Sequence, residues 1–422
     1  MPAKTPMIVI LTFLISPLLV GRAQSPPSQG QQVGLLTLDQ AINYALTNYP
    51  SIRAALERVS AARAGVSLAR TSYLPHADAL WQSNRATRNN IFGLYFPNPV
   101  ISPISGPVLP TTSNQSVWGS AAGLLFSWEP FDFGYRRATV TAAKAGQNRA
   151  MAESGLTRFD VAVAAVNAFM TVLAAQQRVR AARADVERRQ VFTRSVHVLV
   201  DNQLRPGAEA SRADAELARA RTELIRAEQA EEVSRAALAD ILGIAGTAIQ
   251  ISPGPLLSLP STTALTGPAI SAHPLAAAGR ARVDEARARE RVVERSYYPR
   301  FNFQSTVYGR GSGANPDGSV ATGLNGLGLE RANWAAGLTV SFPALDIFAI
   351  RARKEIEASN ERAEAATYEQ TIQDLTAQLQ EARAALEGAL RVAENTPIEL
   401  RAARDTEAQA RARYQPGLAT VV

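Results

Sequence analysis

The chain contains no cysteine and only three histidines, and aromatic side chains make up 6% of its residues. The lack of cysteine excludes disulfides, thiolate metal sites and a lipidated N-terminal cysteine. The histidines lie in separate segments and have no acidic or histidine neighbours at metal-ligand spacing, so we expect no metal site. They are His76, His197 and His273.

Patterns typical of enzymes are also missing. The sequence has no nucleophile-elbow motif, no glycine-rich phosphate loop and no paired-acid signature, so we predict neither catalysis nor a cofactor. No segment after the N-terminus has about 18 uninterrupted apolar residues, so no membrane-spanning helix is expected. The nearest candidate, residues 161–175, contains Asn167 and is predicted to be a buried helix.

The N-terminus has the features of a secretory signal at residues 1–23. Lys4 precedes an apolar stretch from Met7 to Val20, and the small-x-small pattern ending at Ala23 suits cleavage. A membrane anchor is the alternative, but the apolar run is short. The net charge of +7 is spread among arginines interleaved with acids, which favours solvated helix faces over binding of nucleic acid.

The rest of the chain is an internal duplication. Pro50 and Pro75 recur 224 residues later as Pro274 and Pro299. Further equivalent pairs are Asp132 with Asp346, Pro206 with Pro416, and Gly207 with Gly417. Recurrence in the same order indicates two copies of one structural unit.

These equivalences divide the chain. We predict a flexible segment at 24–36, a first repeat at 37–244, a connector at 245–270 and a second repeat at 271–422. By this alignment Val422 corresponds to Arg212, while the first copy continues to Gly243. About thirty residues of a returning helix are therefore expected to be absent from the second repeat.

Each repeat is predicted to contain long helices. Thr37 and Gln40 form a capping-box pattern, and Pro75 ends a later helix because proline cannot continue one. Asp132 is the expected N-cap of a helix roughly 100 Å long, and Pro397 is a candidate helix break. The predicted long helices cover residues 51–73, 134–200, 208–242, 272–296 and 346–413.

A β-hairpin interrupts the helices of each repeat. In the second copy, apolar Phe301, Phe303 and Val307 alternate with polar residues, and so do the residues from Trp334 to Phe342. Alternation over about ten residues with aromatic ends is typical of a transmembrane barrel strand. The first-copy equivalents are 77–84 and 116–128, where Leu124, Phe126 and Trp128 share a face.

The alternative is a soluble, half-buried hairpin, but long helices flank both hairpins and long Gly/Pro/Asn-rich loops close them. Four strands cannot close a barrel, and open edges are not tolerated in lipid. Several chains must therefore share one barrel.

The chain resembles the outer membrane efflux protein family, the TolC-like exit ducts, from residue 36 onward. The resemblance rests on the segment 36–50, on Tyr73-Leu74-Pro75 and Tyr298-Pro299, on residues 130–136, and on residues 414–420. The second strand-to-helix junction, 343–348, lacks the glycine of the first, so the chain is expected to enter that helix differently. The strand–helix junction residues are Pro75, Asp132, Pro299 and Asp346.

The resemblance implies a fold that is mainly α with membrane β: long helical hairpins in a periplasmic α-barrel, and four strands per chain in a shared trimeric β-barrel. It implies a homotrimer in the outer membrane of a Gram-negative-type bacterium, contacting outer-membrane lipid and having a large periplasmic part. The implied partners are a periplasmic adaptor (membrane fusion) protein and an inner-membrane pump of the resistance-nodulation-division or ABC type.

Two turns are expected at the periplasmic tip. The residues predicted to contact the adaptor there are Leu204, Pro206, Gly207, Ala208, Pro416, Gly417 and Leu418. Glu209 and Asp214 are candidates for acids that narrow the tunnel, although acids at a helix N-terminus are also favoured by the helix dipole. The predicted function is passive conduction of substrates in efflux or type I secretion. The alternative is an exported coiled-coil spacer or adaptor without a pore.

Overall fold

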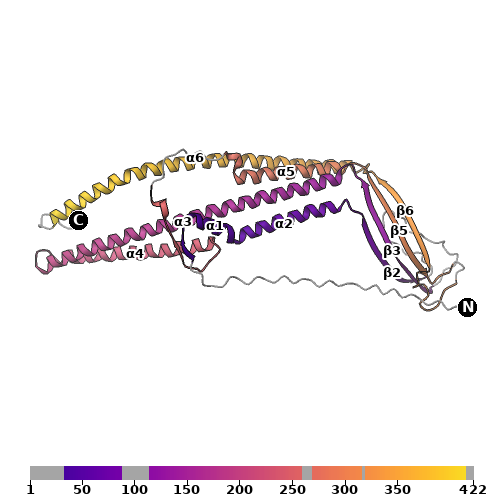
Figure 1. Ribbon diagram of the computed structural model, residues 1–422, viewed down its shortest axis with the longest axis horizontal. Helices are drawn as coiled ribbons and strands as arrows, with labels where there is room; N and C mark the ends of the chain where they lie inside the picture. Colours follow the sequence, from indigo (N-terminus) through magenta and orange to yellow (C-terminus); the bar gives the residue numbers. More distant parts are fainter. Residues whose placement is uncertain (1–32, 88–113, 259–268, 316–318, 415–422) are drawn as a thin grey trace.

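The computed structural model describes residues 33–87, 114–258, 269–315 and 319–414. The molecule is elongated, with a four-stranded sheet at one end and a helical hairpin tip at the other (Figure 1). The predicted signal at 1–23 and the second tip turn at 415–420 lie outside the described residues.

The helices that flank the first hairpin follow the sequence signals closely. Helix α1 (Leu38–Asn48) is capped by Thr37, and the reciprocal hydrogen bonds with Gln40 complete the predicted capping box. Helix α2 (Pro50–Thr71) has a proline in its first turn and ends two residues earlier than predicted. Helix α5 (Pro274–Arg295) is the α2 equivalent in the second repeat, and a proline also opens it.

Helix α3 (Tyr135–Asp201) and helix α4 (Gly207–Ile241) form the long hairpin, and helix α6 (Ile347–Tyr414) is the α3 equivalent. The expected break at Pro397 does not occur, since α6 continues through it. The N-cap of α3 is Gly134 rather than Asp132, because Phe133 and Gly134 adopt positive φ values of 49° and 92° before the helix begins.

The sheet contains strands in the order β2-β3-β5-β6, and every neighbouring pair is antiparallel. Its two hairpins therefore meet through β3 and β5, one strand from each repeat. All four predicted strands are present. Their bounds are β2 (His76–Thr87), β3 (Ser116–Phe131), β5 (Arg300–Ser312) and β6 (Arg331–Ser341).

A second, smaller sheet lies near the middle of the molecule. Strand β1 (Val33–Leu36) pairs in parallel with β4 (Ile249–Ile251). The prediction of a flexible segment through residue 36 was therefore wrong for its last four residues, and the connector 245–270 contains a strand. Short 3₁₀ turns at Gly254–Leu257 and Ile270–Ala272 complete the described part of the connector.

The main hydrophobic core surrounds this small sheet. Strands β1 and β4 pack with α1 and with the middle of α3, where Phe169 and Val172 are fully buried, and with the end of α4, where Leu238 and Leu242 are buried. In the described part of the chain, α3 alone has a stretch long and apolar enough to cross a membrane. Its apolar run at 161–175 contributes five residues to this core.

Candidate functional site

The four-stranded sheet has one apolar and outward-exposed face. Because directly paired residues in a sheet point to the same side, the pairs Trp81↔Ala122, Leu124↔Val307 and Val307↔Trp334 define it. Leu124 is 62% exposed and Trp334 78% exposed. The predicted grouping of Leu124 with other apolar residues of β3 is confirmed, and such a face suits contact with lipid.

The opposite face of the sheet is mostly polar or small. Asn302, Gln304 and Thr306 alternate with the apolar residues of β5. Gly123 on β3 pairs with Tyr308, and a Cβ at Gly123 would clash with the Cβ of Tyr308. Glycine therefore lets β3 and β5 approach closely beneath the tyrosine, an arrangement known to stabilise glycine-containing pairs.

The first strand-to-helix junction is held by a buried ion pair. Arg136 Nε lies 2.7 Å from Asp132 Oδ2, and both side chains are more than nine-tenths buried. The Asp132 carboxylate also accepts hydrogen bonds from the backbone N–H of Gly134 (3.0 Å) and of Arg136 (2.8 Å). Burial raises the pKa of Asp132, but these hydrogen bonds outweigh it and the pKa is lowered.

Arg136 of this ion pair also connects the start of α3 to the end of α2. Arg136 Nη1 donates to the carbonyl of Ser72, at the end of α2, and the guanidinium lies 5.0 Å from the ring centroid of Tyr73. Trp128 Nε1 donates to the carbonyl of Tyr73. Asp132 is therefore not the N-cap residue that its sequence position suggested, but its carboxylate accepts from two backbone N–H groups at the start of α3, and through Arg136 it connects this junction to the end of α2.

The second junction is built differently, as its sequence predicts. Ile350 occupies the place of Arg136, and Asp346 is exposed. The Ile350 N–H donates to the backbone carbonyl of Asp346 at 2.8 Å. Pro75 and Pro299 both precede the strands β2 and β5, as expected for the helix-to-strand junctions.

The first tip turn joins α3 to α4. Leu204 is 67% exposed, Pro206 is the N-cap of α4, and Gly207 opens the helix with nothing within 4 Å of its Cβ position. Two hydrogen bonds fix the backbone of the turn. The Leu204 N–H donates to the Leu199 carbonyl, and the Glu209 N–H donates to the Pro206 carbonyl. The predicted residues 204 and 206–208 thus form one exposed end.

The two predicted acids lie just behind this end, and each has a basic partner. Glu209 pairs with Arg205 at 3.6 Å. Asp214 accepts from His197 Nε2 at 3.0 Å, across the hairpin from α3 to α4. This partnership was not predicted from the sequence, although both residues are nearly equidistant from the Pro206-Gly207 turn.

The histidine makes the hairpin sensitive to pH. Its hydrogen bond to Asp214, the charge of Asp214 and the charge of Asp201 raise the pKa of His197. A raised pKa means that the charged pair is fully formed below pH of about 6.5 and is lost as the pH rises through the higher folded-state pKa. We therefore expect faster hydrogen exchange of the amides at 196–214, after correction for intrinsic rates, above that pKa.

The matched control is His197→Gln, which keeps a polar side chain that does not titrate. Its corrected exchange at the tip is expected to be independent of pH over the same range. Identical pH profiles for the variant and the wild type would show that the His197–Asp214 pair does not control the stability of the tip.

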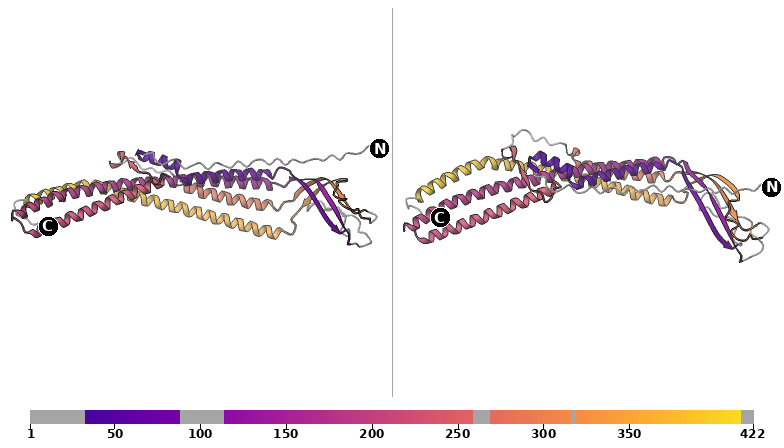
Figure 2. Two further views of the ribbon diagram at one scale, coloured as in Figure 1. Left: turned by 90° about the horizontal axis from the view of Figure 1, so that it is seen from below. Right: turned by 60° about the horizontal axis from the view of Figure 1, so that its bottom comes forward.

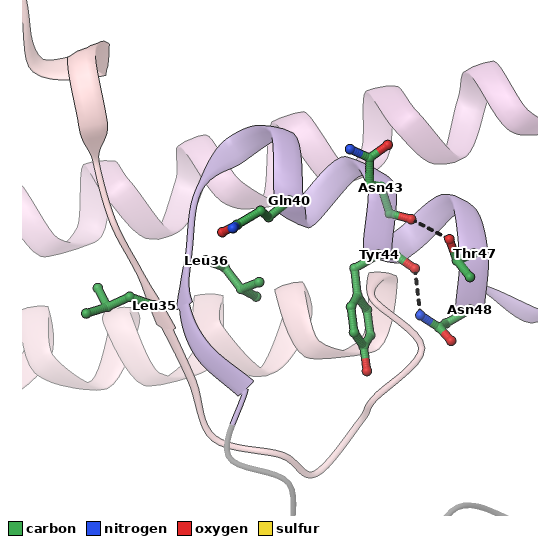
Figure 3. Close-up of a pocket in the computed structure, with 7 residues that line it drawn as sticks. All are labelled: Leu35, Leu36, Gln40, Asn43, Tyr44, Thr47 and Asn48. Carbon is green, nitrogen blue, oxygen red and sulfur yellow. Dashed lines mark hydrogen bonds between the residues drawn. The ribbon is translucent and has the colours of Figure 1, made fainter.

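An open groove of about 580 Å³ lies beside β1 and α1 (Figure 3). Its polar residues bond within α1, where Thr47 donates to the Asn43 carbonyl and Asn48 to the Tyr44 carbonyl. Across the described ranges, no three His, Asp or Glu side chains gather in a way that could hold a metal ion.

Comparison with known proteins agrees with this geometry. Among curated proteins, the chain is 28% identical over 235 residues to Protein CyaE of Bordetella pertussis (strain Tohama I), covering 54% of this chain and 44% of CyaE. The chain therefore matches less than half the length of that relative.

Two solved structures share the fold. A structure of CusC has a TM-score of 0.74 at 16% identity, covering 95% of this chain and 90% of the CusC chain. The outer membrane protein VceC of Vibrio cholerae has a TM-score of 0.69 at 18% identity, covering 91% of this chain and 87% of its own. Both confirm the predicted fold class.

The family described as "Outer membrane efflux protein" matches residues 41–244 and 266–422. The match covers both helix–hairpin–helix repeats and the first tip turn. The chain therefore belongs to the outer membrane efflux protein family.

Proposed function

We propose that the protein is a passive, trimeric exit duct in the outer membrane of a Gram-negative-type bacterium. The observation that carries the proposal is the sheet, which has one apolar face and two unpaired edges among the described residues, at β2 and β6. In lipid each edge must find a partner strand. If several chains form a closed ring, the backbone N–H and C=O groups of each edge strand can pair with the edge strand of the neighbouring chain.

A homotrimer fits this requirement and the family. Three chains would supply twelve antiparallel strands, within the usual range of even-numbered outer-membrane barrels. The polar face of each sheet would line the lumen, and the long helices would continue the duct into the periplasm. The apolar face of the sheet argues against the alternative of a spacer or adaptor without a pore, because a soluble protein would hide such a patch.

The division of the chain is part of the same proposal. The repeats at 37–244 and 271–422 would form two quasi-equivalent sectors of the ring, joined by the connector 245–270. Residues 1–23 would direct export and be removed. Glu209 and Asp214 would line the narrow periplasmic end, each beside its basic partner, Arg205 or His197.

The tip would dock on a periplasmic adaptor that leads to an inner-membrane pump of the resistance-nodulation-division or ABC type. The first turn presents Leu204 and Pro206 at the end of the hairpin. By the duplication, Pro416, Gly417 and Leu418 would form a second docking turn. The duct itself would perform no catalysis, and the pump would supply the energy.

Because the chain has no cysteine, a single introduced thiol can test this contact. We expect Leu204→Cys, labelled with a short thiol-reactive photocrosslinker in cells, to capture a periplasmic adaptor protein. Ile225→Cys on α4 is the matched control, since Ile225 is equally exposed but lies away from the tip. Capture from position 225 and not from 204 would refute docking at the tip.

A further inference from the structure

The helical end of the sheet carries an aromatic belt on its apolar face. A β-bulge between Trp128 and Phe131 resets the alternation of β3, so that both side chains lie on the same face although they are three residues apart. Phe131 packs edge-to-face on Phe301 at 6.3 Å, and Phe133 reaches both Phe301 and Tyr298. Aromatic belts of this kind mark the headgroup level of a membrane.

Exposed arginines lie near the sheet ends of the four helices that adjoin this belt. Arg70, Arg137, Arg295 and Arg351 are all exposed. None of them has an ion pair with a described carboxylate within 4 Å. Each lies within five residues of the sheet end of its helix, which is about 7.5 Å along the axis. Figure 2 shows the four helices leading into the sheet.

Arg295 connects the two features directly. Its guanidinium lies 5.5 Å from the ring centroid of Tyr298, and Tyr298 stacks on Phe133 at 5.9 Å. A cation held against the aromatic belt is placed at the boundary between apolar and polar surroundings, where a headgroup phosphate would lie.

The sheet ends of the four helices contain few acidic residues. Each of the four helices has five residues at its sheet end, and among these residues Glu294 is the one that is acidic. At the tip, Arg205 is paired to Glu209 and His197 to Asp214, whereas Arg194 and Arg212 are exposed there without an ion pair to a described carboxylate. What distinguishes the sheet end is the aromatic belt beside its arginines.

We propose that this arginine collar, Arg70, Arg137, Arg295 and Arg351, binds the phosphates of anionic phospholipid headgroups in the leaflet that faces the helices. The inference rests on the proposed membrane placement of the sheet. Clusters of arginine next to a membrane-embedded segment attract anionic lipid through charge, and arginine donates to phosphate oxygens with a matching geometry. The lipid would fix the depth and tilt of the duct.

The test uses the full-length protein extracted as an oligomer, with native mass spectrometry after exchange into mixed micelles of phosphatidylglycerol and phosphatidylcholine. We expect the wild type to retain phosphatidylglycerol over phosphatidylcholine by on the order of tenfold. The preference should shrink as salt rises, because screening weakens exposed charge interactions. This salt series tests the collar without any variant.

The collar variant Arg70→Gln/Arg137→Gln/Arg295→Gln/Arg351→Gln is expected to reduce the preference to near one. The matched control removes four exposed, unpaired arginines from the middle and distal parts of the hairpin: Arg178→Gln/Arg180→Gln/Arg194→Gln/Arg221→Gln. The control should keep the wild-type preference.

Equal retention of the two lipids by the wild type, or equal loss in both variants, would overturn the collar. The oligomeric state and membrane fraction are recorded first. A membrane-embedded trimer without lipid preference refutes the collar alone, whereas a soluble monomer refutes the proposed duct and the collar with it.

Discussion

Replacing Leu124 with arginine is expected to block assembly of the protein in the membrane. Leu124 lies at the middle of β3 (Ser116–Phe131) on the apolar face, where it is 62% exposed. Placed in lipid at that depth, an arginine costs about 2–4 kcal/mol per chain, and a trimer carries the cost three times. The readout is the yield of heat-modifiable oligomer in the outer-membrane fraction, which we expect to fall at least tenfold.

The neighbouring residue gives a matched control. Leu125 has the same side chain but points to the opposite face, where it pairs with Asp78 and Thr306. Leu125→Arg should assemble at close to the wild-type level, since the charge would face the lumen and Asp78. If Leu125→Arg blocks assembly and Leu124→Arg does not, the two faces of the sheet have been assigned the wrong way round.

Replacing Asp132 with asparagine should destabilise the first junction strongly. Arg136 is 6% exposed and would lose its charged partner, and a buried charge left unpaired costs about 3–5 kcal/mol. The sheet would also lose its connection to Ser72 and Tyr73 through Arg136. The measurement is the denaturant midpoint of the purified protein in detergent, followed by tryptophan fluorescence.

The duplication supplies the control. Asp346 is the equivalent residue of the second repeat, but it is exposed and faces Ile350 rather than an arginine. Asp346→Asn should therefore change the unfolding free energy by no more than about 0.5 kcal/mol, as for most surface substitutions. Equal effects of the two substitutions would mean that the buried ion pair contributes no more to the free energy of unfolding than the exposed Asp346 does.

Much of this architecture could be predicted from local sequence signals. Thr37 and Gln40 form the capping box that the sequence predicted. Pro50 and Pro274 open helices in both repeats because proline suits the first turn. The alternation of apolar and polar residues is weaker in the first hairpin. Its two strands could nevertheless be predicted, because the duplication makes them equivalent to β5 and β6.

Other features depend on contacts between distant segments. Strands β1 and β4 have four and three residues, which is too short for a period to be visible, and they pair across more than 200 residues. The His197–Asp214 pair needs the register of the hairpin, which is set by Gln203 in a left-handed conformation (φ 59°) and by Pro206. The bulge that places Phe131 on the apolar face is likewise visible only in the pairing with β5.

The proline at position 397 shows where a local rule failed. Proline in a helix interior removes a hydrogen bond and clashes with the preceding turn, so Pro397 was a candidate for a helix break. The helix nevertheless runs through Pro397, as long helices can when the disturbance is confined to one turn.

The central claim is that several copies of this sheet share one barrel in the outer membrane. The most direct measurement is the native mass of the protein extracted by detergent from separated outer membranes. The proposal predicts a homotrimer found in that fraction and dissociated only on heating. A monomer that is soluble in the periplasm without detergent would contradict it, because the apolar face and the open edges of the sheet would then have no membrane role.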